Sequence, residues 1–72
     1  MKVTVYLKTP LFAAGHVPSN TWVLEGELQS SDLAGYLVVV SAYKNDDGKE
    51  LDGQTAKLLL PGGKVDHIVL QD

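Results

Sequence analysis

Two histidines and an acidic segment are the parts of this sequence whose side chains could hold a metal ion. His16 lies among glycine and proline residues and His67 lies in an alternating apolar segment, so the pair lacks the spacing of metal ligands. The sequence has no cysteine, which excludes a thiolate metal site and a disulfide. The segment Asn45–Asp52 is acidic, but its glycines do not fit the EF-hand pattern. We therefore predict no metal site.

The nearest approach to a catalytic group is a pair of serines, Ser30 and Ser31, beside Asp32. These residues lack the flanking pattern of a nucleophile turn, and neighbours in sequence are not thereby arranged as a triad. Asp32 is better explained as a turn residue whose carboxylate accepts a hydrogen bond from a backbone N–H two residues on. Gly62 and Gly63 could form a small anion nest, but no glycine-rich loop leads there into a helix. We predict that the chain is not an enzyme and holds no cofactor.

Apolar residues recur at every second position along most of the chain, which indicates strands rather than helices. The third of these strands is apolar on both faces, so we expect something beyond one subunit to cover it. The polar segment 45–53 is predicted to be a loop. The alternation and the turn residues together predict five strands, over residues 2–8, 21–30, 36–43, 55–60 and 64–70.

Residues 9–20 are predicted to form a long loop between the first two strands, because prolines and a glycine interrupt any regular pattern there. Its Leu11–Ala14 portion is too apolar for solvent, so we expect the loop to fold back on the domain or onto a neighbouring subunit. Gly26 within the second strand indicates a bend or a close backbone approach. Trp22 alternates with Leu24 and is predicted to lie in the core.

Five short, strongly bent strands predict an all-β fold, a small antiparallel SH3-like barrel formed by one domain over residues 1–72. The lack of a helix between the third and fourth strands disfavours an OB-fold. In a chain of 72 residues, burial barely offsets the entropy of ordering, and no disulfide is possible. Association with copies of itself is the remaining common route to stability.

Charge and hydropathy limit the partners and the location. The net charge of -3 argues against a general affinity for nucleic-acid backbone, although a few local lysines could serve a specific site. The longest apolar run, Tyr36–Val40, is too short to span a bilayer, and no secretory signal is visible. With no cysteine, the sequence fits a cytoplasmic protein without a membrane partner.

Parts of the sequence resemble the Sm-like family, which includes the Lsm and bacterial Hfq proteins. The first Sm motif is a glycine-bent strand, a turn containing Asp and an apolar strand, and the second is a compact glycine turn between apolar positions. Val3–Leu7 also resembles the first strand of Hfq-type chains. The residues that follow the two motifs are Gly26, Leu28, Asp32, Leu37, Val38 and Val39 for the first and Leu60, Pro61, Gly62, Val65 and Ile68 for the second.

This resemblance implies an Sm-like barrel that assembles into a homo-oligomeric ring of about five to seven subunits. Such rings close when the fifth strand of one subunit pairs with the fourth strand of the next, which satisfies the open strand edges. The alternative is that the apolar residues of these two strands simply fill the barrel. The predicted interface residues are Leu58, Leu59, Leu60, Ile68, Val69 and Leu70.

The resemblance also implies that single-stranded RNA binds at turns around the pore. Two departures weaken uridine recognition, because Tyr36 replaces the base-contacting Asn and Pro61 replaces the stacking basic residue. Tyr36 could stack on a base and Lys64 could contact phosphate, but an ordinary strand aromatic and a solvated turn lysine are the commoner explanations. The candidate RNA-binding residues are Asp32, Gly35, Tyr36, Gly62 and Lys64.

Three functions therefore remain open on the sequence. The leading one is a homo-oligomeric ring that binds single-stranded RNA, and the alternative is a structural or protein-interaction ring without nucleic acid. The third is a monomeric SH3-like adaptor whose groove would be formed by Tyr6, Trp22 and Tyr43.

Overall fold

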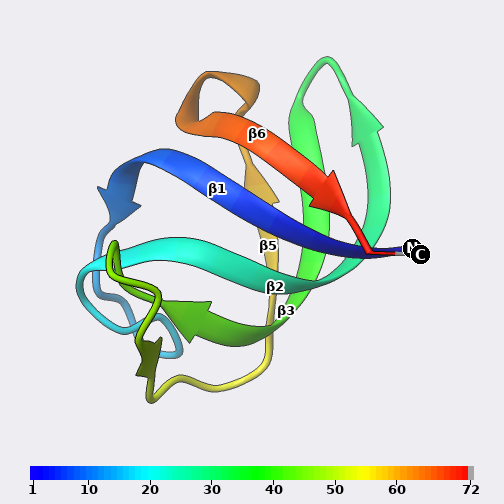
Figure 1. Cartoon of the computed structure of the whole chain (residues 1–72). Coiled ribbons are helices and arrows are strands. Elements are labelled where there is room, and N and C mark those ends of the chain that lie inside the picture. Colours follow the sequence, from blue (N-terminus) through cyan, green and yellow to red (C-terminus); the bar gives the residue numbers. More distant parts are fainter. Residues whose placement is uncertain (72) are drawn as a thin grey trace.

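The chain folds into antiparallel strands and one short 3-10 turn, which confirms the all-β prediction. The computed structural model describes residues 1–71, so Asp72, the last residue of the predicted domain, lies outside the described residues. Figure 1 shows the elements in order: β1 (Lys2–Leu11), β2 (Thr21–Asp32), β3 (Gly35–Lys44), β4 (Glu50–Leu51), β5 (Ala56–Leu60), the 3-10 turn η1 (Gly62–Lys64) and β6 (Val65–Leu70).

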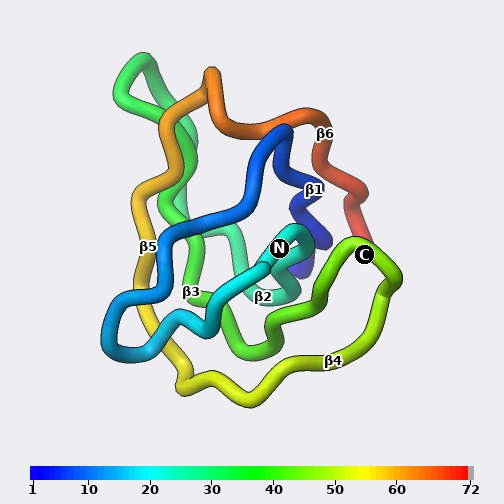
Figure 2. The backbone as a smooth tube through the Cα atoms, turned by 90° about the vertical axis from the view of Figure 1, so that its left-hand side faces the viewer, coloured from blue at the N-terminus to red at the C-terminus, as the bar shows by residue number. Residues whose placement is uncertain are grey.

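The strands pair in the order β4-β3-β2-β1-β6, and β5 pairs with a different part of β3 from β4. Figure 2 shows these strands curved around a common interior, with β5 and β6 on different sides of it. Among residues 1–71, β5 and β6 do not pair with each other, so the hydrogen-bonded sheet stays open between them.

Gly26 allows β2 to bend across β3, as the sequence predicts. The β2–β3 register shifts between Glu25 and Gly26, which is the signature of a bulge. A Cβ at position 26 would lie 2.0 Å from the carbonyl oxygen of Val39, so no larger residue fits without moving β3.

The core takes the alternate residues of β1, as predicted, and one or more residues from every long strand. Thr21 is also fully buried, and its hydroxyl donates a hydrogen bond to the Pro18 carbonyl at 2.7 Å. The core residues are Val3, Val5, Leu7, Leu24, Val38, Val40, Tyr43, Leu60 and Val65.

The prediction that Trp22 lies in the core is wrong. Trp22 is half-buried and belongs neither to the core nor to the side chains packed against it. The β1–β2 register shifts between Tyr6 and Leu11, and the buried position near this shift belongs to Thr21. The alternation of inward and outward side chains along β2 therefore does not extend to the first residues of the strand.

The predicted loop 9–20 begins too early, because Thr9, Pro10 and Leu11 continue β1. The remaining segment contains a tight turn in which Ala14 and Val17 exchange backbone hydrogen bonds of 3.0 and 3.1 Å. Leu11 and Val17 pack against the core, so part of the segment does fold back on the domain.

Other boundaries also differ from the expected ones. β2 reaches Asp32, which shortens the turn before β3, and residue 64 belongs to η1 rather than to the last strand. Within the predicted polar loop, β4 forms a sixth, two-residue strand, because Tyr43 and Lys44 of β3 pair with Leu51 and Glu50.

Candidate functional site

The six residues predicted to form a subunit interface lie on two strands that each have one neighbour within the described chain. β5 pairs with β3 and β6 pairs with β1, and both pairings are antiparallel. An edge strand presents unpaired N–H and C=O groups along its free side. Each of the two strands therefore offers one edge to which another strand can be added.

The six side chains are not equally available on these edges. Leu60 is buried in the core of its own chain, and Leu58 and Ile68 are half-buried and pack against that core. Leu59, Val69 and Leu70 are 57%, 40% and 58% exposed. Leu60 thus fills the core of its own chain, whereas the three exposed side chains leave apolar surface along β5 and β6.

A shallow apolar hollow of about 280 Å³ adjoins β5. On one side of it lies β5, and on the other lie the end of β1 and the segment that follows β1. These two parts of the chain run side by side in Figure 2. Phe12, which is 91% exposed, lines this hollow together with Leu58–Leu60, Leu11 and Val17. An incoming strand at β5 would therefore meet apolar side chains as well as backbone groups.

The structure brings the two predicted pore-side turns into contact. Gly35 has φ +133°, and a Cβ there would lie 2.1 Å from the Leu60 carbonyl oxygen and 3.1 Å from Pro61 Cα. The β2–β3 turn therefore packs directly on the chain that enters η1, which places Asp32, Gly35 and Tyr36 near Gly62. The Asp32 carboxylate accepts a hydrogen bond from the Ala34 backbone N–H at 2.8 Å, the turn role expected for it.

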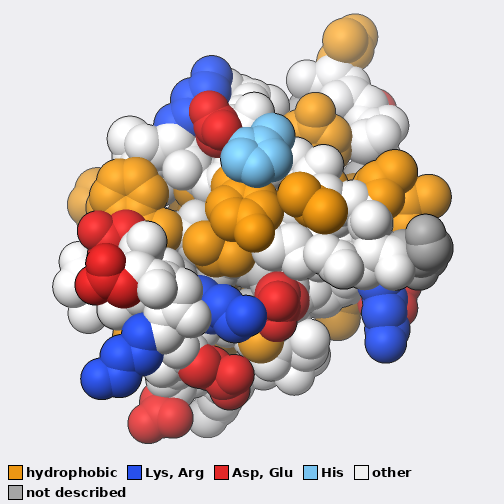
Figure 3. Space-filling view, viewed as in Figure 1, with side chains coloured by type: hydrophobic (Ala, Val, Ile, Leu, Met, Phe, Trp, Pro, Cys, Tyr) orange, Lys and Arg blue, Asp and Glu red, His pale blue; other side chains and the backbone are white. Residues whose placement is uncertain are grey.

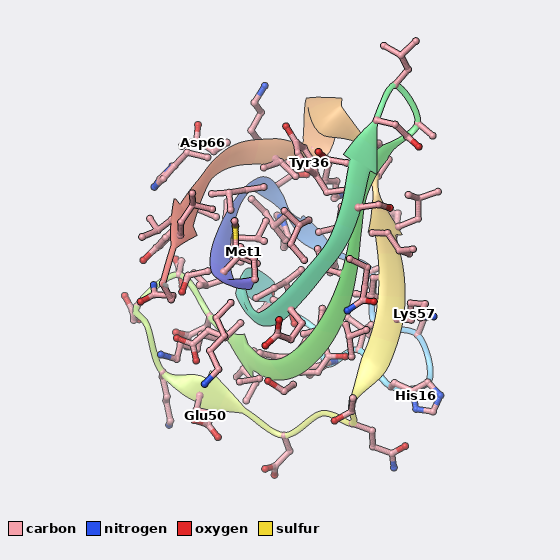
Figure 4. The ribbon with its side chains drawn as sticks, turned by 90° about the vertical axis from the view of Figure 1, so that its right-hand side faces the viewer. Met1, His16, Tyr36, Glu50, Lys57 and Asp66 are labelled. Atoms are coloured by element: carbon pink, nitrogen blue, oxygen red, sulfur yellow. The ribbon has the colours of Figure 1, made fainter. Side chains whose placement is uncertain are left out.

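Tyr36 and Lys64 are both engaged within the chain. Tyr36 lies beside η1 in Figure 4, where it is half-buried and packs against the core. The Lys64 ammonium donates a hydrogen bond to the Pro10 carbonyl at 3.2 Å. A base that stacks on Tyr36 would have to compete with this packing, whereas the Lys64 ammonium keeps two further N–H donors for a phosphate.

A cross-strand aromatic stack was not predicted from the sequence. The rings of Tyr6 on β1 and His67 on β6 lie 4.5 Å apart at an interplanar angle of 7°. His67 Nδ1 lies 2.6 Å from a carboxylate oxygen of Asp66. Alternation places Tyr6 on the outer face of its strand, but the β1–β6 register that sets it opposite His67 is not local information.

The structure does not bring the two histidines together. Figure 4 shows His16 and Asp66, the neighbour of His67, on opposite sides of the molecule. His16 Nδ1 instead lies 2.8 Å from Gln54 Oε1. Among residues 1–71 no group of three or more His, Cys, Asp or Glu side chains is placed to hold a metal ion. In the same residues, no helix has the length and hydropathy needed to cross a membrane.

Comparison with known proteins does not assign the chain to a family: no family model, curated protein or solved structure matches it.

Proposed function

We propose that this chain is an Sm-like barrel subunit that assembles into a closed homo-oligomeric ring through its β5 and β6 edges. The observation that carries this proposal is the pairing order, in which β5 and β6 each have one partner within the described chain. Adding β6 of one copy to β5 of the next would use both free edges. Repeating that contact around a circle pairs the free edge of every β5 and every β6, which is the condition for a closed ring.

The exposed side chains of these strands favour the same contact. Full burial of a Leu or Val side chain stabilises by about 1.5–3 kcal/mol relative to exposure. Leu59 and Leu70 have more than half of their surface in solvent, so covering each should contribute on the order of 1 kcal/mol. Such contributions recur at every interface of a ring.

The ring is best explained as a structural or protein-interaction assembly. Each subunit has a net charge of -3, which disfavours contact between the ring and phosphate groups. In addition, Tyr36 packs against the core and the Lys64 ammonium is hydrogen bonded to Pro10. A scaffold that binds other proteins does not require these two side chains to leave their contacts.

Single-stranded RNA binding is the second candidate, and the contact between the two turns supports it. Gly35 packs on Leu60 and Pro61, so each subunit would present one cluster of turns. A ring multiplies a weak contact per subunit through effective concentration. Stacking of a base on Tyr36, once released, would contribute about 1–3 kcal/mol.

Light scattering of the purified chain, recorded with its ultraviolet absorbance ratio, tests both candidates. The ring predicts a single closed multiple of the 7.8 kDa subunit mass, and the scaffold role predicts the absorbance ratio of protein alone. A monomer at high micromolar concentration would refute the ring. An SH3-like adaptor would then lack Tyr43 in its groove, because Tyr43 is buried in the core.

Fluorescence anisotropy with short U-rich and A-rich RNA then separates the two candidates. RNA binding requires a signal at low salt that weakens in Lys64→Ala but not in the matched variant Lys49→Ala, which removes an exposed lysine from the β3–β4 loop. No binding at low salt would reject RNA and leave the scaffold role.

A further inference from the structure

We propose that a shallow hollow formed by β1, β2 and the β3–β4 loop binds an arginine side chain from a basic segment of a partner protein. We call this feature the aromatic hollow; its volume is about 380 Å³, and Tyr6, Trp22, Val23, Asp46 and Asp47 line it. The inference rests on the proposed protein-interaction role, for which it names the class of partner. None of the residues that line the hollow belongs to β5 or β6.

Two aromatic side chains supply the apolar wall of the aromatic hollow. Trp22 is half-buried and lies outside the core, so part of its indole remains at the surface. Tyr6 is 37% exposed, and its ring is held parallel to His67 at 4.5 Å. Because His67 covers one ring face and fixes the orientation, Tyr6 is positioned before any ligand arrives, which lowers the entropy cost of binding.

The β3–β4 loop contributes two carboxylates to the lining of the aromatic hollow. Asp46 and Asp47 are exposed, and within residues 1–71 neither carboxylate forms an ion pair. The nearby Lys44 does not neutralise them, because its ammonium is paired with Glu25 at 3.1 Å. Figure 3 shows acidic side chains at the left of the face where hydrophobic side chains gather over β1 and β6.

The loop that carries these carboxylates is held in place by its own turn. The Asn45 side-chain oxygen accepts hydrogen bonds of 2.9 Å from the backbone N–H groups of Asp47 and Lys49. The Asn45 carbonyl also accepts one from the Gly48 N–H at 3.0 Å. The turn that carries the two aspartates is therefore held by hydrogen bonds between Asn45 and the residues that follow it.

Aromatic rings beside unpaired carboxylates match the chemistry of a guanidinium group. Arginine stacks on aromatic faces, donates several hydrogen bonds to carboxylates and loses its hydration shell more readily than lysine. A phosphate or carboxylate ligand would be repelled. The six basic residues of this chain are all lysines, so a second copy cannot supply the arginine. An arginine in this hollow would therefore come from another protein.

Fluorescence of Trp22, the single tryptophan of the chain, gives a local measure of binding. The native protein is titrated with a glycine–serine peptide carrying three arginines and with the same peptide carrying the neutral isostere citrulline. We expect a saturable change with the arginine peptide, binding about tenfold weaker with citrulline, and loss of affinity at high salt. No saturable change with arginine, or equal affinity for the two peptides, would overturn the proposal.

Matched variants test the role of the aromatic hollow. The double variant Asp46→Asn/Asp47→Asn should weaken binding of the arginine peptide about tenfold. Asp52→Asn removes an exposed carboxylate that does not line the hollow and should leave binding unchanged. Weakening by Asp52→Asn equal to that in the double variant would mean general charge attraction and would overturn the site.

The mass of the same samples separates this inference from the proposed ring. A ring that does not respond to the arginine peptide refutes the inference and leaves the assembly standing. A monomer that binds the peptide through Asp46 and Asp47 refutes the ring and supports the site.

Discussion

Replacing Gly26 by alanine tests whether the close crossing of β2 over β3 determines the fold. The added Cβ would lie 2.0 Å from the Val39 carbonyl oxygen and 2.9 Å from the Val39 carbonyl carbon and from Val40 Cα. All three contacts are with backbone, so no side-chain rotation can relieve them. The β2–β3 pair would have to separate at the bulge that bends the sheet.

The expected cost follows from this geometry. Overpacking by one methyl group typically costs about 1–3 kcal/mol, and a contact this short with backbone places Gly26→Ala at or above the upper end. A domain of this length has a total stability of roughly 4–11 kcal/mol. A loss of about 3 kcal/mol should lower Tm by roughly 12–24 °C in a domain of this size.

Thermal and urea unfolding of Gly26→Ala and Gly62→Ala measure the effect with a matched control. A Cβ at Gly62 would meet no atom within 4 Å, so the same substitution there should be neutral or stabilise by up to about 1 kcal/mol, through a less flexible unfolded chain. Equal stabilities for Gly26→Ala and the native chain would refute the close approach of β2 to β3.

Two further predictions concern the free edge and the buried phenol. Leu59→Lys should weaken each subunit interface by at least tenfold, because it removes about 1 kcal/mol of apolar burial and places a charge in the interface. The control Leu33→Lys, at the fully exposed β2–β3 turn, should keep the native mass in sedimentation. Equal masses for the two variants would contradict the β5 interface. Tyr43→Phe should cost about 1 kcal/mol in urea unfolding at neutral pH, because the Tyr43 hydroxyl donates a 2.8 Å hydrogen bond to the Gln54 carbonyl. Burial raises the pKa of Tyr43 above 10.0, so the contribution of its hydroxyl to the free energy of unfolding is complete below that pH and is lost as the pH rises through the pKa of the folded state. The difference in unfolding free energy between the native chain and Tyr43→Phe should therefore shrink in alkali. A difference that stays constant with pH would contradict this.

The strand pattern and the bend could be predicted from the sequence because both depend on local information. Val3, Val5 and Leu7 alternate with polar or aromatic residues of the other face, and they enter the core as that alternation requires. Gly26 marks a bend because glycine within a strand permits a backbone approach that other residues prevent.

The features that could not be predicted depend on contacts between distant residues. β4 forms because Leu51 pairs with Tyr43 of β3, and a two-residue segment carries too little sequence pattern to predict that pairing. The Tyr6–His67 stack depends on the β1–β6 register, and the Lys64–Pro10 hydrogen bond joins residues 54 positions apart. Motif position alone identifies the candidate RNA-binding residues, and it carries no information about whether Tyr36 packs inward.

Amide hydrogen exchange along β5 and β6 tests most directly whether these edges pair between copies. In a strand with one neighbour, every second N–H points to solvent and exchanges rapidly, whereas a strand paired on both sides protects consecutive N–H groups. The ring predicts slow exchange at consecutive residues from Lys57 to Leu60 and from Asp66 to Val69. Fast exchange at alternate residues in both strands, at concentrations where light scattering is measured, would contradict the proposed assembly.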